Sequence, residues 1–406
     1  MAQIKVDMND MPKYPRIIFL NQMAGPLFRE LAEDISKERT PSLLITGHPD
    51  TLRAPRIGSL RIVVAPTYRT ENNTVRLISW LRYTFCALVR CWRQPRSALL
   101  FLVSNPPILG IVGYLSKRLR GQRYVSLIHD IYPDVLINFG VLKKTGLITR
   151  LWERMNRLIY ENAEVVFTIG NKMAERLGQK FDRSKTLPGN VVVIPNWADT
   201  DRIRPISKDK NDFAKRYGQV GKLTVMYSGK LGETHDIETI LAAAKELKED
   251  DSISFMIIGE GPKMKLVLEA RLQDDLDNLT VLPFQSEDTL PFSLPTGDIF
   301  IVTLDKGCAG LSVPSKTYYA MAAGAALIGL CEDESEVAHT IQQHRCGIVV
   351  APDDLEGLVS GILALASDES KLNDYRANSR SAAEKFYSRR NTSRYLEAMC
   401  TVGALQ

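Results

Sequence analysis

The stretch that decides the fold reads GCAGLSVPSKTYYAMAAG and spans residues 307–324. It follows a strand-like apolar run at 298–304, and its glycines predict a turn after that strand. Residues 317–323 predict a short helix, with Lys316 immediately before it. A helix N-terminus carries unpaired N–H groups and a partial positive charge, so this loop is suited to an anion such as phosphate. The alternative is that its serines and its lysine only cap and solvate the helix.

Length and composition are typical of a globular protein with more than one domain. The chain has 406 residues, of which 45% are hydrophobic and 24% are charged. No apolar run reaches the roughly 18–20 residues that a membrane-spanning helix needs. The N-terminal residues lack the apolar core of a secretory signal, so we expect none. The six cysteines show no Cys-x-x-Cys pairing, which predicts reduced thiols in a cytosolic protein.

The net charge is +5, and its distribution predicts a basic surface on the first half of the chain. No Asp or Glu occurs between Asn72 and His129, whereas arginines and lysines are frequent there. A helix over 76–93 places an apolar arc beside arginines, and such a helix can lie among anionic lipid headgroups. The apolar arc comprises Leu77, Ile78, Leu81, Phe85, Leu88, Val89 and Trp92.

Two readings of this helix remain. It could pack its apolar arc on its own sheet and leave its arginines in water. Because Lys117, Arg118, Arg120 and Arg123 follow it, we favour a membrane-facing surface over 76–123. The arginines accompany an aliphatic stripe rather than stacking aromatics, so we expect no nucleic-acid binding.

Strands and helices alternate along both halves, which predicts an α/β protein with two parallel sheets. In the first half the predicted strands are 16–20, 42–46, 62–65, 98–103, 124–128, 165–169 and 191–194, and the main helices are 27–37, 76–93, 107–120, 147–162 and 171–177. In the second half the predicted strands are 223–228, 254–258, 279–282, 298–304, 325–330 and 346–350, and helices follow at 237–248, from Lys263, 317–323, 336–344, 355–366, 371–386 and 392–399. The polar segment 200–212 is the predicted linker between the halves.

Candidate site residues of the first half follow predicted strands. His129 and Asp130 end the strand at 124–128, and α/β sheets place ligands at the carboxyl ends of their strands. A neutral imidazole there could hydrogen-bond a sugar hydroxyl, or it could only cap the loop. Asp199 and Asp201 match an Asp-x-Asp metal signature, but their place at the domain junction favours a chance match. We therefore expect no metal.

The second half offers two cationic loops on one sheet. Lys230 follows Gly229 in a strand-to-helix loop, as Lys316 does in its own loop. Two such loops could hold a diphosphate from two sides. The glycines around Glu260, among them Gly261, leave room for a flat base or a ribose, and the carboxylate could accept hydrogen bonds from hydroxyls. A basic first half and a phosphate-binding second half suggest a lipid-linked acceptor and a nucleotide-linked donor.

The order and spacing of these motifs resemble family 4 retaining glycosyltransferases with the GT-B fold, over nearly the whole chain. The motifs that carry the resemblance are Gly25 in the first loop, His129, Pro195-Asn196-Trp197-Ala198-Asp199, Ser228-Gly229-Lys230, Gly259-Glu260-Gly261-Pro262 and residues 312–324. The Pro-Ser-Lys of the last motif is similar to that of the subgroup that builds O-antigen, capsule or exopolysaccharide.

The resemblance implies two Rossmann-like domains that face each other across a cleft. Residues 1–200 would form an acceptor-binding domain and residues 201–385 a nucleotide-sugar-binding domain. The C-terminal helix, 386–406, would pack back on the first domain. The implied enzyme is a metal-independent retaining hexosyltransferase without a cofactor. It would move a sugar from a nucleoside-diphosphate sugar, UDP-linked, to a polyprenyl-diphosphate-linked saccharide in exopolysaccharide or lipopolysaccharide synthesis. It would be cytoplasmic and peripheral on the inner leaflet of the inner membrane through 76–123.

The resemblance also implies a role for each site residue. Gly25 would let the first loop approach the transferring sugar, and His129 would contact that sugar near the reacting centre. Lys230 would bind the donor diphosphate and stabilise the leaving group, where charge develops in the transition state. The remaining donor contacts would come from Gly229, Glu260, Gly261, Ser312, Val313 and Ser315.

The chain departs from the family pattern at two places. The family usually has an arginine at the Lys230 place and a lysine five residues later, where this chain has His235. It also usually has two glutamates that bracket seven residues, where this chain has Leu311 and Tyr319. The ribose and sugar contacts of those glutamates are therefore missing, and our hypothesis is that Lys316 supplies the second cation.

The same residues bear on the reaction mechanism and on two alternative functions. No carboxylate stands out as a nucleophile, Asp130 being the only candidate, which favours a front-face retaining mechanism over a double displacement. A GT-B-fold sugar-nucleotide epimerase is the alternative enzyme, and it would act without an acceptor. A catalytically silent sugar-nucleotide or membrane-binding module is the alternative from another class, because the two glutamates are absent.

Overall fold

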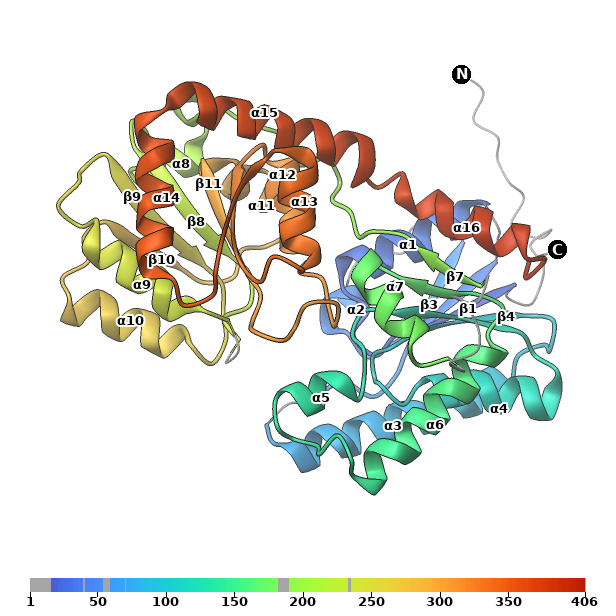
Figure 1. Cartoon of the computed structure of the whole chain (residues 1–406). Coiled ribbons are helices and arrows are strands. Elements are labelled where there is room, and N and C mark those ends of the chain that lie inside the picture. Colours follow the sequence, from blue (N-terminus) through green and yellow to red (C-terminus); the bar gives the residue numbers. More distant parts are fainter. Residues whose placement is uncertain are drawn as a thin grey trace, which may run out of the picture. The chain divides into compact units, whose positions relative to one another are not determined.

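The computed structural model describes residues 16–38, 41–53, 59–69, 71–181, 190–232 and 235–405. The chain divides into two compact units (Figure 1). Unit 1 comprises Met1–Pro195 with Arg390–Gln406, and unit 2 comprises Asn196–Arg389. These boundaries fall a few residues from the expected ones at 200 and 385. The N-terminal residues that bear on a secretory signal lie outside the described residues.

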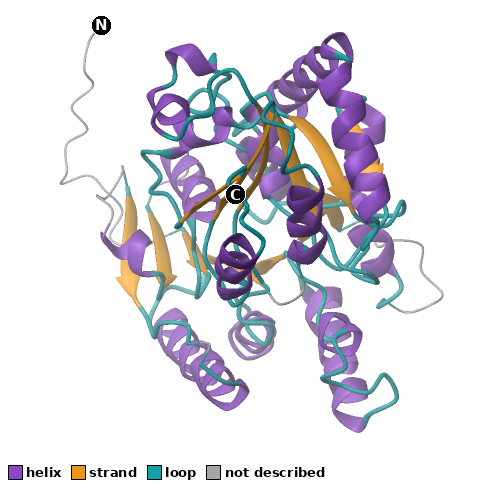
Figure 2. Cartoon of the chain, turned by 90° about the vertical axis from the view of Figure 1, so that its left-hand side faces the viewer, coloured by secondary structure: helices purple, strands orange, loops and turns teal. Residues whose placement is uncertain are grey.

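Unit 1 is built on a parallel sheet in which seven described strands have the order β3-β2-β1-β4-β5-β6-β7. Its strands are β1 (Ile17–Leu20), β2 (Ser42–Thr46), β3 (Leu60–Val64), β4 (Leu99–Val103), β5 (Tyr124–Ile128), β6 (Val166–Thr168) and β7 (Val191–Val193). Every residue of β1, β2, β4 and β5 is buried. Continuous burial without alternation is expected for a parallel sheet with helices on both faces, as Figure 2 shows.

The helices of unit 1 include one from the far end of the chain. They are α1 (Pro26–Glu38), α2 (Pro49–Arg53), α3 (Asn73–Trp92), α4 (Gly110–Arg120), α5 (Asp134–Asn138), α6 (Leu147–Asn162), α7 (Asn171–Gly178) and α16 (Asn391–Thr401). The ring of Tyr395 of α16 packs against those of Phe101 and Phe167, which stack on each other. Thr392 Oγ1 also donates to Asp34 Oδ2 of α1 at 3.2 Å. The C-terminal helix is thus part of the core of unit 1.

Helix α3 turns its apolar arc outward, which contradicts the reading that this arc packs on the sheet. Leu81 is 53% exposed and Phe85 is 69% exposed. The side chains that face inward are Ser79, Trp80, Tyr83, Ala87 and Cys91. Tyr83 anchors this inward face, because its hydroxyl donates to the carbonyl of Ile45 at 2.7 Å. No helix in the described part of the chain combines the length and the hydropathy that crossing a bilayer requires.

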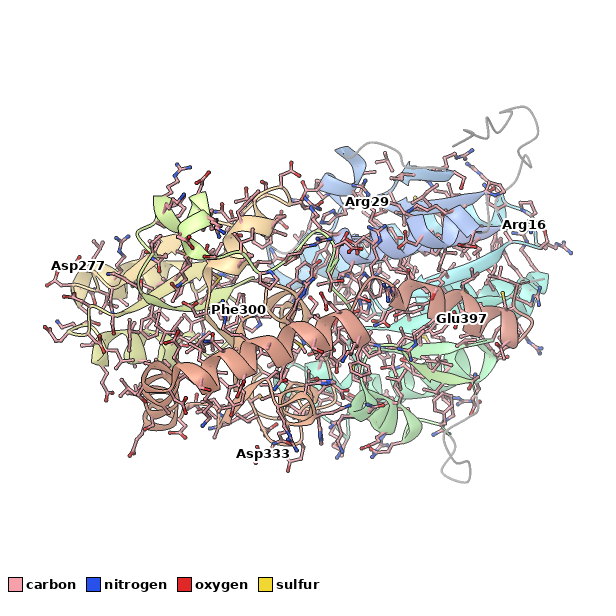
Figure 3. The ribbon with its side chains drawn as sticks, turned by 90° about the horizontal axis from the view of Figure 1, so that it is seen from above. Arg16, Arg29, Asp277, Phe300, Asp333 and Glu397 are labelled. Atoms are coloured by element: carbon pink, nitrogen blue, oxygen red, sulfur yellow. The ribbon has the colours of Figure 1, made fainter. Side chains whose placement is uncertain are left out.

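Unit 2 repeats the architecture with six described parallel strands in the order β10-β9-β8-β11-β12-β13. These are β8 (Leu223–Ser228), β9 (Ile253–Ile258), β10 (Leu279–Leu282), β11 (Ile299–Thr303), β12 (Ala326–Leu330) and β13 (Gly347–Val350). Its helices are α8 (Asp212–Arg216), α9 (Ile237–Glu246), α10 (Met264–Gln273), α11 (Leu290–Ser293), α12 (Lys316–Ala322), α13 (Glu336–His344), α14 (Leu355–Ser367) and α15 (Glu369–Phe386), with 3-10 turns η1 (Lys208–Lys210) and η2 (Leu294–Thr296). Phe300 lies in the buried centre of the unit, whereas Asp277 and Asp333 lie at its periphery (Figure 3).

The segment predicted as a linker, 200–212, is fixed to unit 2 rather than loose. The guanidinium of Arg380 donates to the carbonyls of Thr200 at 2.9 Å and Ile203 at 2.8 Å. It also donates to the carbonyl of Ala322, the last residue of α12, at 2.6 Å. Further along, Lys208 forms an ion pair with Asp298. The polar composition that suggested a linker therefore reflects these specific contacts.

Candidate functional site

The loops after β8 and β9 meet backbone to backbone, and glycine is required there. Gly229 N donates to the carbonyl of Ile258 at 2.9 Å, and Leu231 N donates to that of Glu260 at 2.8 Å. A Cβ on Gly259 would lie 1.9 Å from the carbonyl oxygen of Gly229. A Cβ on Gly261 would lie 2.3 Å from that of Leu231, and Gly261 also has a φ of 149°. The space beside these glycines is taken by the neighbouring loop, so packing already explains the motif that we attributed to a ligand.

Lys316 joins these loops from α12. Its Nζ donates to Tyr227 Oη at 2.6 Å and lies 4.0 Å from the centre of the Tyr227 ring. The same Nζ is 3.6 Å from the position that a Cβ on Gly229 would take. Burial lowers the pKa of Lys316 to about 7. The structure therefore brings together Lys316 and the Gly229–Lys230 loop, as the sequence predicts. The Lys230 residue itself is exposed.

The serines before α12 do not cap it in the way the simpler reading of this stretch proposed. In the described chain Ser315 is the N-cap residue and makes no side-chain cap hydrogen bond. Its carbonyl instead accepts from Tyr318 N at 3.0 Å. Ser312 and Ser315 are half-buried, and Val313 is buried. Glu260 is exposed at the end of its loop. These residues follow strands β9 and β11 of one sheet, so they share its carboxyl edge.

Two residues support the two lysines: Tyr227, which sequence reasoning missed, and His235, which it named only as a departure from the family pattern. Tyr227 is 1% exposed in β8, and its hydroxyl donates to the carbonyl of Lys230 at 2.8 Å. His235 Nδ1 lies 2.8 Å from Tyr227 Oη and 2.7 Å from that carbonyl oxygen. Burial, assisted by the charge of Lys316, lowers the pKa of His235 to about 4, so this residue is neutral at pH 7 and supplies no second cation. A buried strand tyrosine gives no signal of such a role in the sequence.

At the two positions where the family usually has glutamates, this chain has the uncharged residues Leu311 and Tyr319. Leu311 is 1% exposed and belongs to the core. Tyr319 is half-buried on α12. Nearby, Glu332 Oε2 accepts from Gly307 N at 3.0 Å and holds the loop that follows β11.

The candidates of unit 1 lie at the carboxyl edge of its own sheet. Ser104, after β4, accepts through Oγ from His129 N at 3.0 Å and from Asp130 N at 3.4 Å. Burial lowers the pKa of His129 to about 4 and raises that of Asp130 to about 6. Gly25 follows β1, and a Cβ there would meet no atom within 4 Å. The site thus offers a neutral imidazole and an uncrowded backbone.

The Asp-x-Asp match is part of a turn. Asp199 Oδ1 accepts from Asp201 N and from Arg202 N, each at 3.0 Å. Asp199 Oδ2 lies 3.7 Å from the guanidinium of Arg389. Both carboxylate oxygens of Asp199 thus take part in the turn or in this ion pair.

Models of two protein families match the two halves of the chain. Residues 24–197 match "Glycosyl transferase 4-like domain", and residues 222–368 match "Glycosyl transferases group 1". Both models describe glycosyltransferase domains, and together they cover most of the chain. The predicted fold, with two Rossmann-like domains, is confirmed.

Two relatives match part of the chain. The protein "Probable glycosyltransferase WbjE" of Pseudomonas aeruginosa is 30% identical over 265 residues, 64% of this chain and 64% of the relative. WcaI of Escherichia coli (strain K12), provisionally assigned as a colanic acid biosynthesis glycosyl transferase, is 28% identical over 253 residues, 61% of each protein. Each match spans less than two thirds of the relative's own length.

A solved structure shares the fold over almost the whole chain. The crystal structure of Anabaena Alr3699/HepE in complex with UDP and glucose superimposes with a TM-score of 0.71. The match covers 97% of this chain and 100% of the other, at 14% sequence identity. At that identity, the comparison shows the fold alone.

Proposed function

We propose that this chain is a retaining glycosyltransferase that moves a hexose from a UDP-linked sugar to a polyprenyl-diphosphate-linked saccharide. The two glycosyltransferase domain models that match the chain support glycosyl transfer. The WcaI assignment names colanic acid biosynthesis, which supports a role in surface polysaccharide synthesis. The HepE structure contains UDP, which supports UDP as the nucleotide. The observation that carries the proposal is the position of Lys316 beside the Gly229–Lys230 loop.

The two lysines give this loop cluster the chemistry that a diphosphate leaving group needs. Negative charge builds on the leaving phosphate as the glycosidic bond breaks, and fixed cations stabilise it in the transition state. Lys230 would reach the diphosphate from its exposed position, and Lys316 from its place over Tyr227. With this charge supplied by lysines, the proposed reaction needs neither a metal nor a cofactor.

Retention is proposed to occur on one face of the sugar, with the leaving phosphate accepting the proton of the acceptor hydroxyl. Asp130 is the one carboxylate candidate for a nucleophile; burial raises its pKa to about 6, and the proposed front-face reaction does not use it. His129 is neutral at pH 7 and can hydrogen-bond a sugar hydroxyl. Gly25 leaves space for the sugar to approach the backbone.

A membrane-facing surface on unit 1 would bring the enzyme to its lipid-linked acceptor. On α3 the exposed apolar residues lie beside the exposed Arg82, and the exposed Arg93 follows directly after the helix. Helix α6 adds Leu147, 82% exposed, and Leu151, 66% exposed. Its exposed residues also include Ile148, Arg150, Arg154, Arg157 and Leu158. Leucines beside arginines suit the boundary between acyl chains and anionic headgroups, so we propose peripheral binding to the inner leaflet.

Nucleotide binding tests the donor half of the proposal. We expect UDP to stabilise the protein against heat more than GDP or CDP does, by mass action. Lys230→Met and Lys316→Met should each weaken UDP binding by roughly tenfold or more, because a charged hydrogen bond contributes about 1.5–3 kcal/mol. Lys245→Met, at an exposed ion pair with Asp274, is the control and should bind UDP as the wild type does. Wild-type affinity in Lys316→Met, or no binding of any nucleotide, would contradict the donor site.

Transfer from radiolabelled UDP-sugars to a membrane extract tests the reaction itself. An NMR spectrum of the product should show the anomeric configuration of the donor. Inverted product would refute retention. Interconversion of the donor without acceptor would point to an epimerase, and binding without turnover would point to the silent module that Leu311 and Tyr319 suggest.

Vesicle flotation tests the membrane surface. The pairs Leu81→Ser/Phe85→Ser and Leu147→Ser/Leu151→Ser should each reduce binding to phosphatidylglycerol vesicles by about thirtyfold, since each lost side chain contributes on the order of 1 kcal/mol. Leu272→Ser is the matched control, because Leu272 is 78% exposed on α10 of unit 2. Equal binding to neutral phosphatidylcholine vesicles, or equal loss in the control, would refute the assignment.

A further inference from the structure

We propose that Tyr227 is a positioning residue that couples Lys316 to the Lys230 loop, with neutral His235 as its support. The inference rests on the proposed function, because it describes how the site for the donor diphosphate is assembled. One hydroxyl makes the connection. Tyr227 Oη accepts from Lys316 Nζ at 2.6 Å and donates to the carbonyl of Lys230 at 2.8 Å. The Tyr227 hydroxyl thus holds both the side chain of Lys316 and the main chain of Lys230.

A tyrosine is suited to this task because it holds an ammonium group without neutralising it. The Tyr227 ring lies 4.0 Å from Lys316 Nζ, within the range of a cation–π contact, and it is rigid because it is buried in β8. A carboxylate in the same place would form an ion pair with Lys316 and would repel a diphosphate. The tyrosine leaves the positive charge available to an incoming anion.

His235 keeps the loop in place and adds no charge. Its Nδ1 lies within hydrogen-bonding distance of both Tyr227 Oη and the Lys230 carbonyl oxygen. Lys263 Nζ donates to the carbonyl of His235 at 2.7 Å and to Glu238 Oε2 at 2.6 Å, which fixes the histidine backbone. Because burial and the nearby lysines lower its pKa to about 4, His235 holds the Lys230 loop as a neutral group throughout the neutral range.

The electrostatic surroundings of Lys316 give the proposal a measurable signature. Burial lowers its pKa to about 7, and the charge of Asp305 acts in the opposite direction. Among the described residues, Tyr227 contacts Lys316 directly, and His235 lies close enough for the charge of Lys316 to lower its pKa. Lys316 is therefore partly deprotonated in the free protein near neutral pH. An arriving diphosphate favours the ammonium form, so binding should take up a proton.

The first measurement uses the protein without ligand. NMR of the reductively ¹³C-methylated protein, with Lys316→Arg to assign the signal, gives the pKa of Lys316. In Tyr227→Phe this pKa should fall by about one pH unit, because the ammonium loses a hydrogen-bond acceptor. Tyr375→Phe is the control, since Lys371 lies 5.9 Å from that ring on α15. An unchanged Lys316 pKa in Tyr227→Phe, in a protein that still unfolds at the wild-type temperature, overturns the coupling.

The second measurement is calorimetric titration with UDP at about pH 8, in two buffers of different ionisation enthalpy. The wild type should take up a proton on binding, and Lys316→Met should not. Tyr227→Phe should weaken UDP binding several-fold in the wild-type background and clearly less in the Lys316→Met background, where only the contact with the Lys230 carbonyl remains to be lost. Equal weakening in both backgrounds overturns the proposal. If UDP fails to bind the wild type while Tyr227→Phe still shifts the Lys316 pKa, the coupling stands and the proposed function fails.

Discussion

Replacing Gly259 with alanine should destabilise unit 2 and leave unit 1 intact. The Cβ of the new alanine would lie 1.9 Å from the carbonyl oxygen of Gly229, far inside the distance at which carbon and oxygen can approach. Neither atom is at the end of a flexible side chain, so the loops after β8 and β9 must separate.

The size of the effect follows from what the separation breaks. Overpacking of this kind costs about 1–3 kcal/mol. The hydrogen bonds from Gly229 N to Ile258 and from Leu231 N to Glu260 join the same loops, and weakening them costs about 1 kcal/mol in total. The free energy of unfolding of unit 2 should therefore fall by roughly 2–4 kcal/mol.

Hydrogen exchange measured by mass spectrometry reports the two units separately. Amides of β8 and β9 that exchange through unfolding of unit 2 should exchange roughly thirtyfold to several-hundredfold faster in Gly259→Ala. Amides of β1 and β4 in unit 1 provide an internal reference. Gly25→Ala is the matched control, because a Cβ there would meet no atom within 4 Å. Unchanged exchange in β8 and β9 would show that the loops can part without cost and would refute the reasoning.

Three further predictions concern other parts of the fold. Gly25→Ala should keep the wild-type stability within about 0.5 kcal/mol but reduce sugar transfer at least about tenfold, if the sugar approaches that loop; full activity would contradict the role of Gly25. Arg380→Met should destabilise unit 2 by roughly 2–4 kcal/mol in the same exchange experiment, because the carbonyls of Thr200, Ile203 and Ala322 lose a charged donor; normal exchange in β12 would count against this. The third prediction concerns acid. Neutral His129 has a pKa lowered to about 4, so it contributes stability that is lost as pH falls from about 6.5 to 4. Asp130 has a pKa raised to about 6, so it costs stability above that pH and the cost disappears on acidification. Urea unfolding of unit 1 between about pH 4 and 7 should therefore show a steeper loss toward acid in Asp130→Asn and a shallower one in His129→Gln than in the wild type, and parallel curves for all three proteins would disprove the assignment of these two groups.

The order of strands and helices could be predicted from the sequence because it depends on local patterns. Continuous apolar runs flanked by glycines gave β8 at 223–228 with its observed bounds, and the helix predicted at 147–162 is α6. Short helices such as α2 and α5 were missed, since five residues carry too little periodicity to distinguish a helical turn from a loop. The predicted helix at 76–93 is α3. Which of its faces packs against the sheet could not be predicted from the helical periodicity of its residues.

That choice depends on what the sheet of unit 1 offers. Trp80 and Tyr83 fill the space under α3, and Tyr83 reaches a backbone carbonyl of β2, so the more hydrophobic arc is left outside. A helical periodicity identifies the most hydrophobic face of a helix. The face that becomes buried is also selected by how well its side chains fit the sheet and which hydrogen bonds they can make there.

The sequence by itself determined two parallel sheets, the loops at their carboxyl ends and the presence of two lysines in such loops. Only the tertiary structure decided that Tyr227 joins Lys316 to the Lys230 loop and that His235 is neutral. The physical reason is the range of the interactions: strand and turn preferences act between neighbours in the chain, whereas the contact from Lys316 to Tyr227 joins residues 89 positions apart. Such a contact exists only after β8 has paired with β11 in the sheet, which brings α12, the helix after β11, next to β8.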